Sequence, residues 1–413
     1  MKPYLPSAAL LCLVALPSAL AAQQAVISPV GEVRVRFEAD RPSTVDTLDA
    51  FTLLRTRLGV DARFGSGARA FIQVQDSRAF GEEAGTLDGS AETFDMHQGW
   101  LELARRWEPV QLSARVGRQE IALGSERLLG AVGWSNVGRS FDALRVDATP
   151  ARLPWVLTGV VATVSERGRR MGVTPEVDDD HTLLVLWAEG RLLDAFVFHD
   201  RSARYRTFEG VDRTTLGGRL DVPAHARMQG FAEGAYQLGN QLDTERLRSQ
   251  DIAAWLLTGR AWLPLEGRLR SVGAGLDWLS GDADPTDDEY GAFNTLYATN
   301  HKFYGYLDLF TDPAAQTGDR GLVDAVASAQ AQLTERVGLA VDLHGFWFTR
   351  TRAAEERMIG WELDLTLPVA MGTGQRLALG YSAFRAGPGA SLIGRGAEGG
   401  LWHWAYAQAS VSF

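Results

Sequence analysis

Apolar and polar residues alternate with a period of two along most of the chain, in pieces of about 9–14 residues. In one piece, Val33, Val35 and Phe37 lie on one face and the charged residues between them lie on the other. Alternation of this kind predicts β-strands whose two faces meet different surroundings. We expect about 18 strands, with cores at 30–38, 51–63, 67–78, 94–106, 109–121, 137–149, 154–165, 180–189, 190–199, 211–222, 226–237, 250–262, 266–279, 322–334, 336–348, 354–368, 374–385 and 400–413.

The connections between these strands alternate between short and long. Short turns are predicted at 65–67, 107–109, 150–154, 189–191, 223–225, 264–267, 334–336 and 368–374. Long loops are predicted at 39–50, 79–93, 122–136, 166–179, 201–210, 238–249, 280–321 and 386–399, and only 349–353 is short where a long loop is expected. Successive turns of an up-and-down barrel lie at opposite rims, and outer-membrane barrels keep the turns of one rim short. The pattern predicts an all-β fold, a transmembrane up-and-down antiparallel β-barrel of about 18 strands.

A barrel of this width cannot fill its interior with apolar side chains. We therefore expect the apolar strand faces to contact outer-membrane lipid and the polar faces to line a water-filled lumen. The last strand also alternates and ends on Phe413, which looks like the assembly signal of bacterial outer-membrane proteins.

The first residues have the pattern of an export signal. Lys2 adds a positive charge, an apolar stretch runs from Leu5 to Leu20, and Ala19-Leu20-Ala21 offers a cleavage site. This predicts a cleaved signal peptide over residues 1–21, followed by a single barrel domain over residues 22–413. An uncleaved membrane anchor is the alternative. The predicted location is the bacterial outer membrane.

Composition narrows the functions open to such a barrel. The 413 residues include 51 Asp and Glu against 41 Lys and Arg, a net charge of −10, so a nucleic-acid partner is not expected. The single cysteine, Cys12, excludes a disulfide scaffold, a cysteine-ligated zinc site and an iron–sulfur centre. No G-x-S-x-G, H-E-x-x-H or phosphate-loop motif occurs, so we expect no enzyme activity, no cofactor and no metal.

Charged residues are unevenly distributed over the expected lumen wall. By strand parity, arginines concentrate on the first six strands and acids dominate the later ones, which predicts a transverse electric field. The planar guanidinium suits carboxylate solutes because it binds them through two parallel hydrogen bonds. The predicted solute path comprises Arg34, Arg36, Arg55, Arg57, Arg115, Arg127, Arg139, Arg145, Arg219, Asp147, Asp342 and Glu362. The alternative is that these charges only solvate the wall and pair with one another.

Two of the predicted loops are candidates to enter the pore. Residues 124–136 contain glycines that would let the loop fold inward and present Arg127, although a solvated surface loop is the alternative. Residues 280–321 form the longest loop, and the aromatic stretch 303–310 favours a lid, a plug or an additional strand. Its acidic start, residues 282–289, has oxygen ligands that could hold Ca²⁺, although a solvated acidic loop is the simpler interpretation.

Two stretches also carry recognisable motifs. Residues 117–145 contain Gly124-Ser125-Glu126-Arg127-Leu128-Leu129-Gly130 and Trp134-Ser135-Asn136, and residues 297–308 contain Tyr297-Ala298-Thr299-Asn300-His301-Lys302. Both stretches resemble the alginate-export family of outer-membrane porins. The resemblance implies an 18-stranded barrel that passes an acidic polysaccharide through an arginine-rich constriction.

Three functional hypotheses follow from the barrel and the resemblance. The first is a passive outer-membrane channel for an anionic saccharide or a related solute, with a periplasmic export partner. The second is a general uptake porin for small solutes. The third is a surface receptor or structural barrel that is plugged by loop 280–321.

Overall fold

The computed structural model describes residues 25–42, 44, 47–65, 67–81, 94–165, 181–202, 210–223, 227–243, 248–353 and 355–413. The predicted signal peptide, residues 1–21, lies outside the described residues and stays a prediction. Among the described residues, no helix is long and apolar enough to span a membrane.

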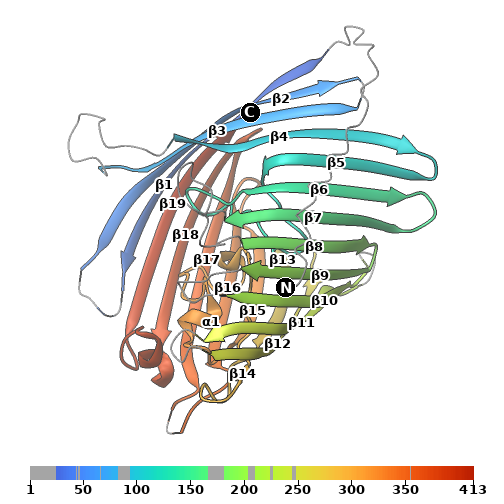
Figure 1. The fold of residues 1–413 in the computed structure, drawn as a ribbon. Coiled ribbons are helices and arrows are strands. Elements are labelled where there is room, and N and C mark those ends of the chain that lie inside the picture. Colours follow the sequence, from blue (N-terminus) through green and yellow to red (C-terminus); the bar gives the residue numbers. More distant parts are fainter. Residues whose placement is uncertain are drawn as a thin grey trace, which may run out of the picture.

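Most of the described chain is β-strand (Figure 1). The strands are β1 (Val26–Arg41), β2 (Asp49–Phe64), β3 (Ala68–Ala79), β4 (Phe94–Trp107), β5 (Val110–Gln119), β6 (Phe141–Pro150), β7 (Trp155–Ser165), β8 (His181–Gly190), β9 (Leu193–Ser202), β10 (Val211–Asp221), β11 (Gln229–Asp243), β12 (Arg248–Pro264), β13 (Leu269–Leu279), β14 (Glu289–Tyr290), β15 (Leu322–Gln332), β16 (Gly338–Phe348), β17 (Met358–Gly372), β18 (Gln375–Ala386) and β19 (Leu401–Ser412). Short helices are η1 (Asn300–Lys302), α1 (Pro313–Gln316) and η2 (Pro388–Ile393).

The strands form one closed antiparallel barrel. Each long strand pairs with its neighbours in sequence, and β1 closes the ring by pairing with β19. At the end of this seam the backbones of Gly31 and Phe413 exchange two hydrogen bonds of 2.9 and 3.0 Å. The two-residue β14 pairs in parallel with β12, whereas β13 pairs directly with β15, so β14 adds no strand to the wall. The predicted 18-stranded barrel is confirmed.

One predicted loop is wrong. Residues 238–249 are largely strand, because β11 continues to Asp243 and β12 begins at Arg248. The glycine, asparagine and glutamine of this stretch look like loop residues, but they extend the antiparallel ladder of the two strands, which pairs Asn240 with Asp251 and Asp243 with Arg248. Sheet pairing here overrides local propensity.

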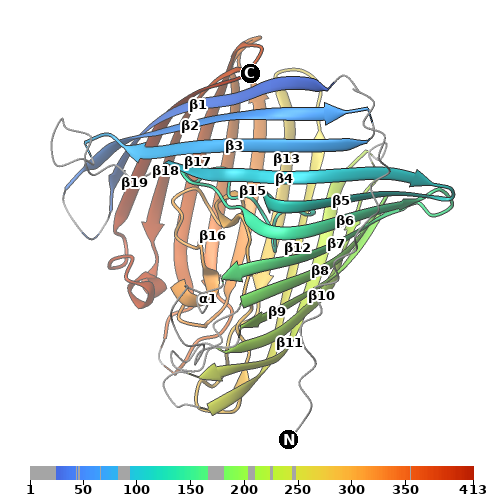
Figure 2. The same cartoon turned by 45° about the horizontal axis from the view of Figure 1, so that its top comes forward.

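The two faces of the wall differ as the alternation predicts. Large apolar side chains such as Leu58, Leu186 and Leu257 are exposed on the outside. Lumen-facing positions hold buried charged groups, including Arg57 on β2 and Asp200 on β9. We name the two rims the short-turn end, which includes the turns before β3 and β5, and the long-loop end (Figure 2).

Two long segments lie inside the ring of strands. The first inward segment is residues 120–140, between β5 and β6, and the second inward segment is residues 280–321, between β13 and β15. The lumen faces of β6 to β9 contribute apolar side chains such as Phe141 and Phe198 to a buried hydrophobic cluster. Ile121, Leu128 and Leu129 of the first inward segment belong to the same cluster. Burial of each such side chain stabilises the inward position by about 1.5–3 kcal/mol.

The two inward segments also bind each other. The backbone N–H of Gly130 donates to the carbonyl oxygen of Tyr297 at 2.9 Å, and the N–H of Thr299 donates to that of Glu126 at 2.9 Å. The Lys302 ammonium forms an ion pair with the Glu126 carboxylate. Residues 280–321, predicted as a lid, a plug or an additional strand, thus lie inside the barrel against residues 120–140, and whether they close the pore stays a prediction. We name the two inward segments together the plug.

Candidate functional site

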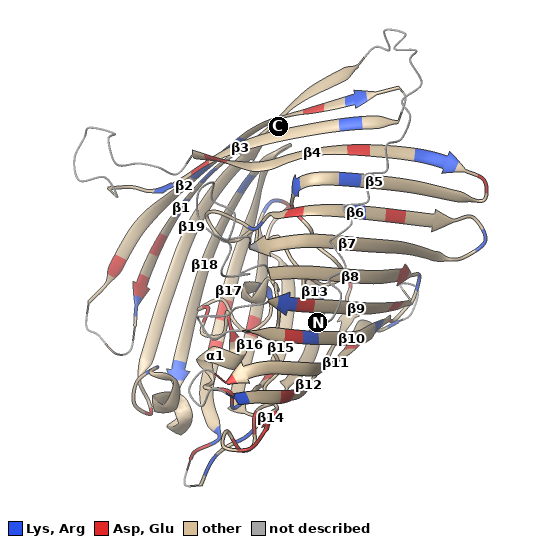
Figure 3. Cartoon of the chain, viewed as in Figure 1, with Lys and Arg blue, Asp and Glu red and all other residues tan. Residues whose placement is uncertain are grey.

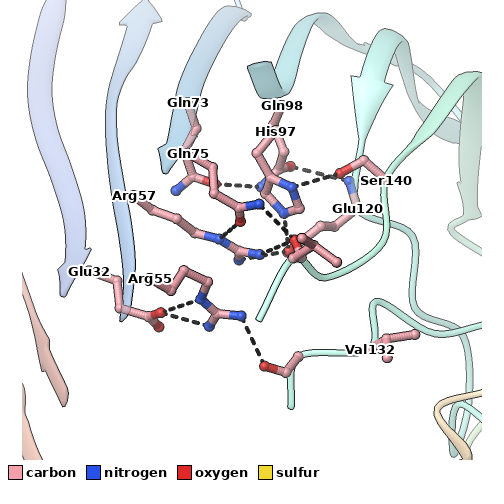
Figure 4. A network of polar contacts seen from close by, with 12 residues as sticks. Glu32, Arg55, Arg57, Gln73, Gln75, His97, Gln98, Glu120, Val132 and Ser140 are labelled. Atoms are coloured by element: carbon pink, nitrogen blue, oxygen red, sulfur yellow. Dashed lines mark hydrogen bonds and ion pairs between the residues drawn. The ribbon is translucent and has the colours of Figure 1, made fainter. Parts of the chain in front are cut away.

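Four buried arginines of β1 and β2 hold the first inward segment against the wall. Arg34 donates to the carbonyl oxygens of Gly133 and Ser135 at 2.8 and 2.9 Å. Arg55 donates to the same two oxygens at 3.1 and 2.9 Å, and its other side binds Glu32 through two hydrogen bonds. The two guanidiniums therefore clamp one short stretch of backbone, as Figure 4 shows in part for Arg55.

Arg57 holds the start of the same segment. Its guanidinium forms an ion pair with Glu120 at 3.0 Å and donates to Gln75 at 2.6 Å (Figure 4). The ring of His97 lies 2.7 Å from the same Glu120 oxygen. Burial disfavours the charged carboxylate, but the His97 hydrogen bond and the Arg57 charge outweigh it and lower the pKa of Glu120 below its ordinary value. Glu120 is therefore held as an anion.

Arg36 supports the tip of the segment. It donates to the carbonyl oxygen of Trp134 at 2.7 Å, and its guanidinium lies 3.9 Å from the centre of the Trp134 ring. The Trp134 ring stacks on His301 of the second inward segment at 4.4 Å and meets the edge of Tyr406 on β19 at 4.9 Å. The four predicted arginines Arg34, Arg36, Arg55 and Arg57 thus do face the lumen, and the groups they bind belong to the protein itself.

Acidic residues of β17 bind the second inward segment. Glu362 accepts a hydrogen bond from the backbone N–H of Leu307 at 2.8 Å, and Asp364 accepts one from Tyr306 at 3.3 Å. Gly305 beside them has φ of +82°, and an added Cβ there would lie 2.5 Å from a Glu362 oxygen. Glycine is required at this position by both the backbone conformation and the close approach. The predicted lumen residue Glu362 is buried beneath the plug.

Two predicted pore arginines have different surroundings from those expected. Arg127 does not present a free charge, because its side chain is 1% exposed, forms an ion pair with Asp277 at 2.9 Å and covers the Phe303 ring at 4.0 Å. Arg139 is not on a strand, because β6 begins only at Phe141. Its guanidinium donates to the carbonyl oxygens of Tyr297 and Ala298, so it joins the two inward segments. Burial lowers the pKa of Arg139 from its ordinary value.

Four lumen-facing arginines remain partly exposed and form one row across β2 to β6. Arg63 lies opposite Arg69, Arg69 opposite Glu102, Glu102 opposite Arg115, and Arg115 opposite Arg145. The side chains of Arg63, Arg69, Arg115 and Arg145 are 65%, 32%, 23% and 24% exposed. We name these four residues the arginine row. Figure 3 shows basic positions on β2 and β3 toward the short-turn end and on β5 farther from that end.

Each member of the arginine row has an acidic neighbour. Asp61 pairs with Arg63 and Arg69 at 2.8 and 2.7 Å, Glu102 pairs with Arg115 at 2.5 Å, and Asp147 pairs with Arg145 at 2.9 Å. Four guanidiniums thus share three carboxylates. The Trp100 ring lies between Arg69 and Arg115, whose charged groups are 5.1 and 4.0 Å from its centre.

The remaining predicted residues lie elsewhere on the lumen wall. Arg219 on β10 pairs with Asp221 and Glu233 at 2.8 and 3.4 Å, and Asp342 on β16 accepts a hydrogen bond from Ser328. Neither adjoins the arginine row. The sequence reasoning missed Arg69, although its pairing with Arg63 across the turn at 65–67 follows from the hairpin register.

The described part of the chain was predicted to hold no metal, with Ca²⁺ at residues 282–289 as the alternative. No group of three or more His, Cys, Asp or Glu among those residues has the arrangement to hold a metal ion. In the acidic stretch 282–289, Asp284 and Asp287 accept hydrogen bonds from nearby backbone N–H groups, as turn residues do.

Comparisons with known proteins agree with this architecture. A sequence model of the family described as "Alginate export" matches residues 27–391. Among solved structures, OccAB1 of Acinetobacter baumannii is similar with a TM-score of 0.60 and 11% identity over 94% of this chain and 97% of that chain. OccK2 (OpdF) of Pseudomonas aeruginosa in complex with glucuronate gives 0.58 and 12%, and OpdK of the same organism with vanillate gives 0.56 and 12%, both over 94% of this chain and 98% of theirs. No curated protein sequence is significantly similar.

Proposed function

Because the chain belongs to the alginate-export family, we propose that this outer-membrane barrel is a passive channel for an anionic saccharide or a related organic anion. The observation that carries the proposal is the arginine row, which presents four partly exposed guanidiniums to the lumen from β2, β3, β5 and β6. A guanidinium binds a carboxylate through two parallel hydrogen bonds and does not lose its charge.

The charge on the opposite wall supports the same function. Five carboxylates, those of Asp277, Asp324, Asp342, Glu362 and Asp364, face the lumen from β13, β15, β16 and β17. The cations that pair with Asp277 are Arg127 and Arg260, and the His344 ring contacts Asp324. Of these five side chains only Asp342 is partly exposed, because the other four are buried. Asp342 therefore repels a solute anion from that side, the arginine row attracts it, and low-dielectric walls strengthen this field.

The comparisons add further support. The structurally similar porins include one solved with glucuronate and one solved with vanillate, both of which are small organic acids. We propose that the short-turn end faces the periplasm, as in other outer-membrane barrels. The absence of the hydrolase and nucleotide-binding motifs from the sequence supports a transport role without catalysis.

Anion selectivity tests the proposal. The double variant Arg115→Gln with Arg145→Gln removes two charges from the arginine row and keeps hydrogen-bonding groups. A matched control, Arg105→Gln with Arg118→Gln, removes the same charge from β4 and β5 at positions that alternate with the lumen-facing ones. In a salt gradient across a planar bilayer, the reversal potential of the test variant should shift toward cation preference and glucuronate should block it less. The shift should shrink at 1 M salt, where the Debye length is about 3 Å. Equal shifts in both variants would remove the main support for the proposal.

A plugged receptor is the second candidate function, and one observation favours it. The two inward segments bind each other as well as the wall. These contacts hold the backbone of both segments in place inside the barrel. Single-channel conductance separates the two functions. A channel shows discrete open steps in the unmodified protein, whereas a plugged receptor conducts only after the inward segments are displaced.

A further inference from the structure

A pocket opens in the lumen wall about halfway round the ring from the arginine row. Its volume is about 470 Å³, within the range of about 300–1,000 Å³ that is usual for small-molecule sites. It lies near the short-turn end of β11, β12, β13, β15 and β16, where β12 ends at Pro264. The side chains that line it and carry the argument are Gln229, Arg260, Trp262, Ser328, Gln330 and Asp342.

Two glycines of β13 leave the room that the pocket needs. A Cβ added to Gly273 would lie 2.9 Å from the Cβ of Trp262, and one added to Gly275 would collide with the Arg260 side chain. The Trp262 indole N–H donates to the side-chain oxygen of Gln229 at 2.9 Å, which fixes the ring on the wall. The pocket therefore has an aromatic side chain of fixed position beside β13, whose glycines leave space in front of it.

The polar groups around the ring are mixed in kind. Arg260 donates to Asp277 at 2.7 Å through one terminal nitrogen, and its other terminal nitrogen is buried without a hydrogen-bond partner among the described residues. Arg270 also lines the pocket and is exposed. Asp342 accepts from the Ser328 hydroxyl, and the exposed Gln330 offers a donor and an acceptor. Donors and acceptors thus surround one aromatic side chain.

This mixture fits a hydroxyl-rich ring better than a simple anion. An ionised Asp342 only accepts hydrogen bonds, so it attracts hydroxyl groups and repels carboxylates. An aromatic acid could pack on Trp262 but would have few hydroxyl groups for Asp342 and Gln330. A pyranose ring supplies an apolar face for the indole and several hydroxyl groups at its edge.

We propose that this pocket, the Trp262 pocket, is a saccharide subsite at the short-turn mouth of the channel. One pyranose ring packs on Trp262, its hydroxyl groups bond to Asp342 and Gln330, and an oxygen of the ring substituents accepts from Arg270, which lines the pocket and is exposed. The inference rests on the proposed function, because it names the class of anion that the channel carries. A sugar acid entering this mouth meets guanidiniums on one wall and a hydroxyl-binding pocket on the other.

Blocking events in single-channel recordings test the subsite. The probes are a trimer of mannuronate, the neutral sugar maltotriose and the aromatic acid vanillate, each added at the short-turn side. Trp262→Leu removes the aromatic platform, and Asp342→Asn keeps the shape of the pocket while it weakens the acceptor. Trp402→Leu and Asp221→Asn are matched controls, because both residues face the lumen outside the pocket. Heat-dependent migration on gels shows that each variant is a folded barrel.

The expected result is a mean blocking time for both sugars that is about two- to tenfold shorter in Trp262→Leu, with a smaller reduction in Asp342→Asn. Vanillate block and the two controls should be unchanged. If Trp262→Leu does not fold, Asp342→Asn alone decides. Unchanged sugar blocking times in a pocket variant, or equal shortening for vanillate, would overturn the subsite while anion selectivity of the unmodified channel stands. Loss of anion selectivity in the unmodified protein would instead overturn the proposed function.

Discussion

Replacing Arg34 should loosen the first inward segment without disturbing any other charge pair. Arg34 binds the carbonyl oxygens of Gly133 and Ser135, and it forms no ion pair with a carboxylate among the described residues. Arg55 continues to bind both oxygens in the variant, so neither is left without a donor. The substitution Arg34→Met keeps the apolar stem of the side chain and removes only the guanidinium.

The size of the effect follows from those two bonds. Hydrogen bonds to charged groups contribute about 1.5–3 kcal/mol each, and the remaining Arg55 bonds and substitute water offset part of the loss. We expect docking of residues 133–137 to weaken by about 1.5–3 kcal/mol in total. That corresponds to a population of the released segment about ten- to a hundredfold higher.

Thiol labelling measures that population. The only cysteine of the chain is Cys12, so a Ser135→Cys background would carry a single reactive thiol once residues 1–21 are removed. The labelling rate of Cys introduced at this position should rise in Arg34→Met by the same factor as the released population. A matched control is Arg376→Met, which removes an exposed arginine from the lumen face of β18. A labelling rate that does not change in Arg34→Met, or that changes equally in the control, would refute the role of Arg34 in holding the first inward segment.

Three further outcomes are expected. Leu343 lies at the middle of β16 and is 43% exposed, so Leu343→Arg should cost about 2–4 kcal/mol in unfolding from lipid vesicles, and a neutral result would argue against lipid contact. Deletion of Phe413, which closes the seam, should slow assembly into the outer membrane; normal assembly kinetics would contradict that role. Because the pKa of Glu120 is lowered, its ion pair with Arg57 should stabilise docking fully above about pH 4.5 and lose this effect as the pH falls through the lowered pKa. The labelling rate of the first inward segment, divided by the rate of a free thiol at the same pH because only the thiolate reacts, should therefore be constant from pH 7 to 5. A rise of this ratio within that range would contradict the assignment.

The strands and their lumen faces could be predicted because a period of two is a local property. Arg34, Arg36, Arg55 and Arg57 face the lumen as parity requires, since each lies inside a long regular strand whose neighbours alternate. The same reasoning placed Arg115 and Arg145, which the structure brings directly opposite each other. Strand parity does not identify the group that a side chain binds, however, so it could not predict that the arginines of β1 and β2 bind the first inward segment.

The inward segments could not be predicted because their positions depend on distant partners. Arg127 is 150 residues from Asp277 in sequence, so no local pattern predicts their ion pair. Arg139 was assigned to a strand that begins two residues later, since the segment before β6 folds against Tyr297 and Ala298 of the second inward segment. The Trp262 pocket depends on glycines of a neighbouring strand, which alternation does not place opposite a particular aromatic ring.

The seam between β1 and β19 has a consequence for how the first inward segment reaches its position. Trp134 contacts Arg36 of the first strand and Tyr406 and Trp404 of the last strand. Its binding site is therefore formed by strands from the two ends of the chain. An open sheet that still lacks β19 provides the contact with Arg36 but not those with Tyr406 and Trp404. The contacts of Trp134 are therefore complete only when the C-terminal strand has been added, so the tip of the first inward segment reaches its final position together with closure of the wall.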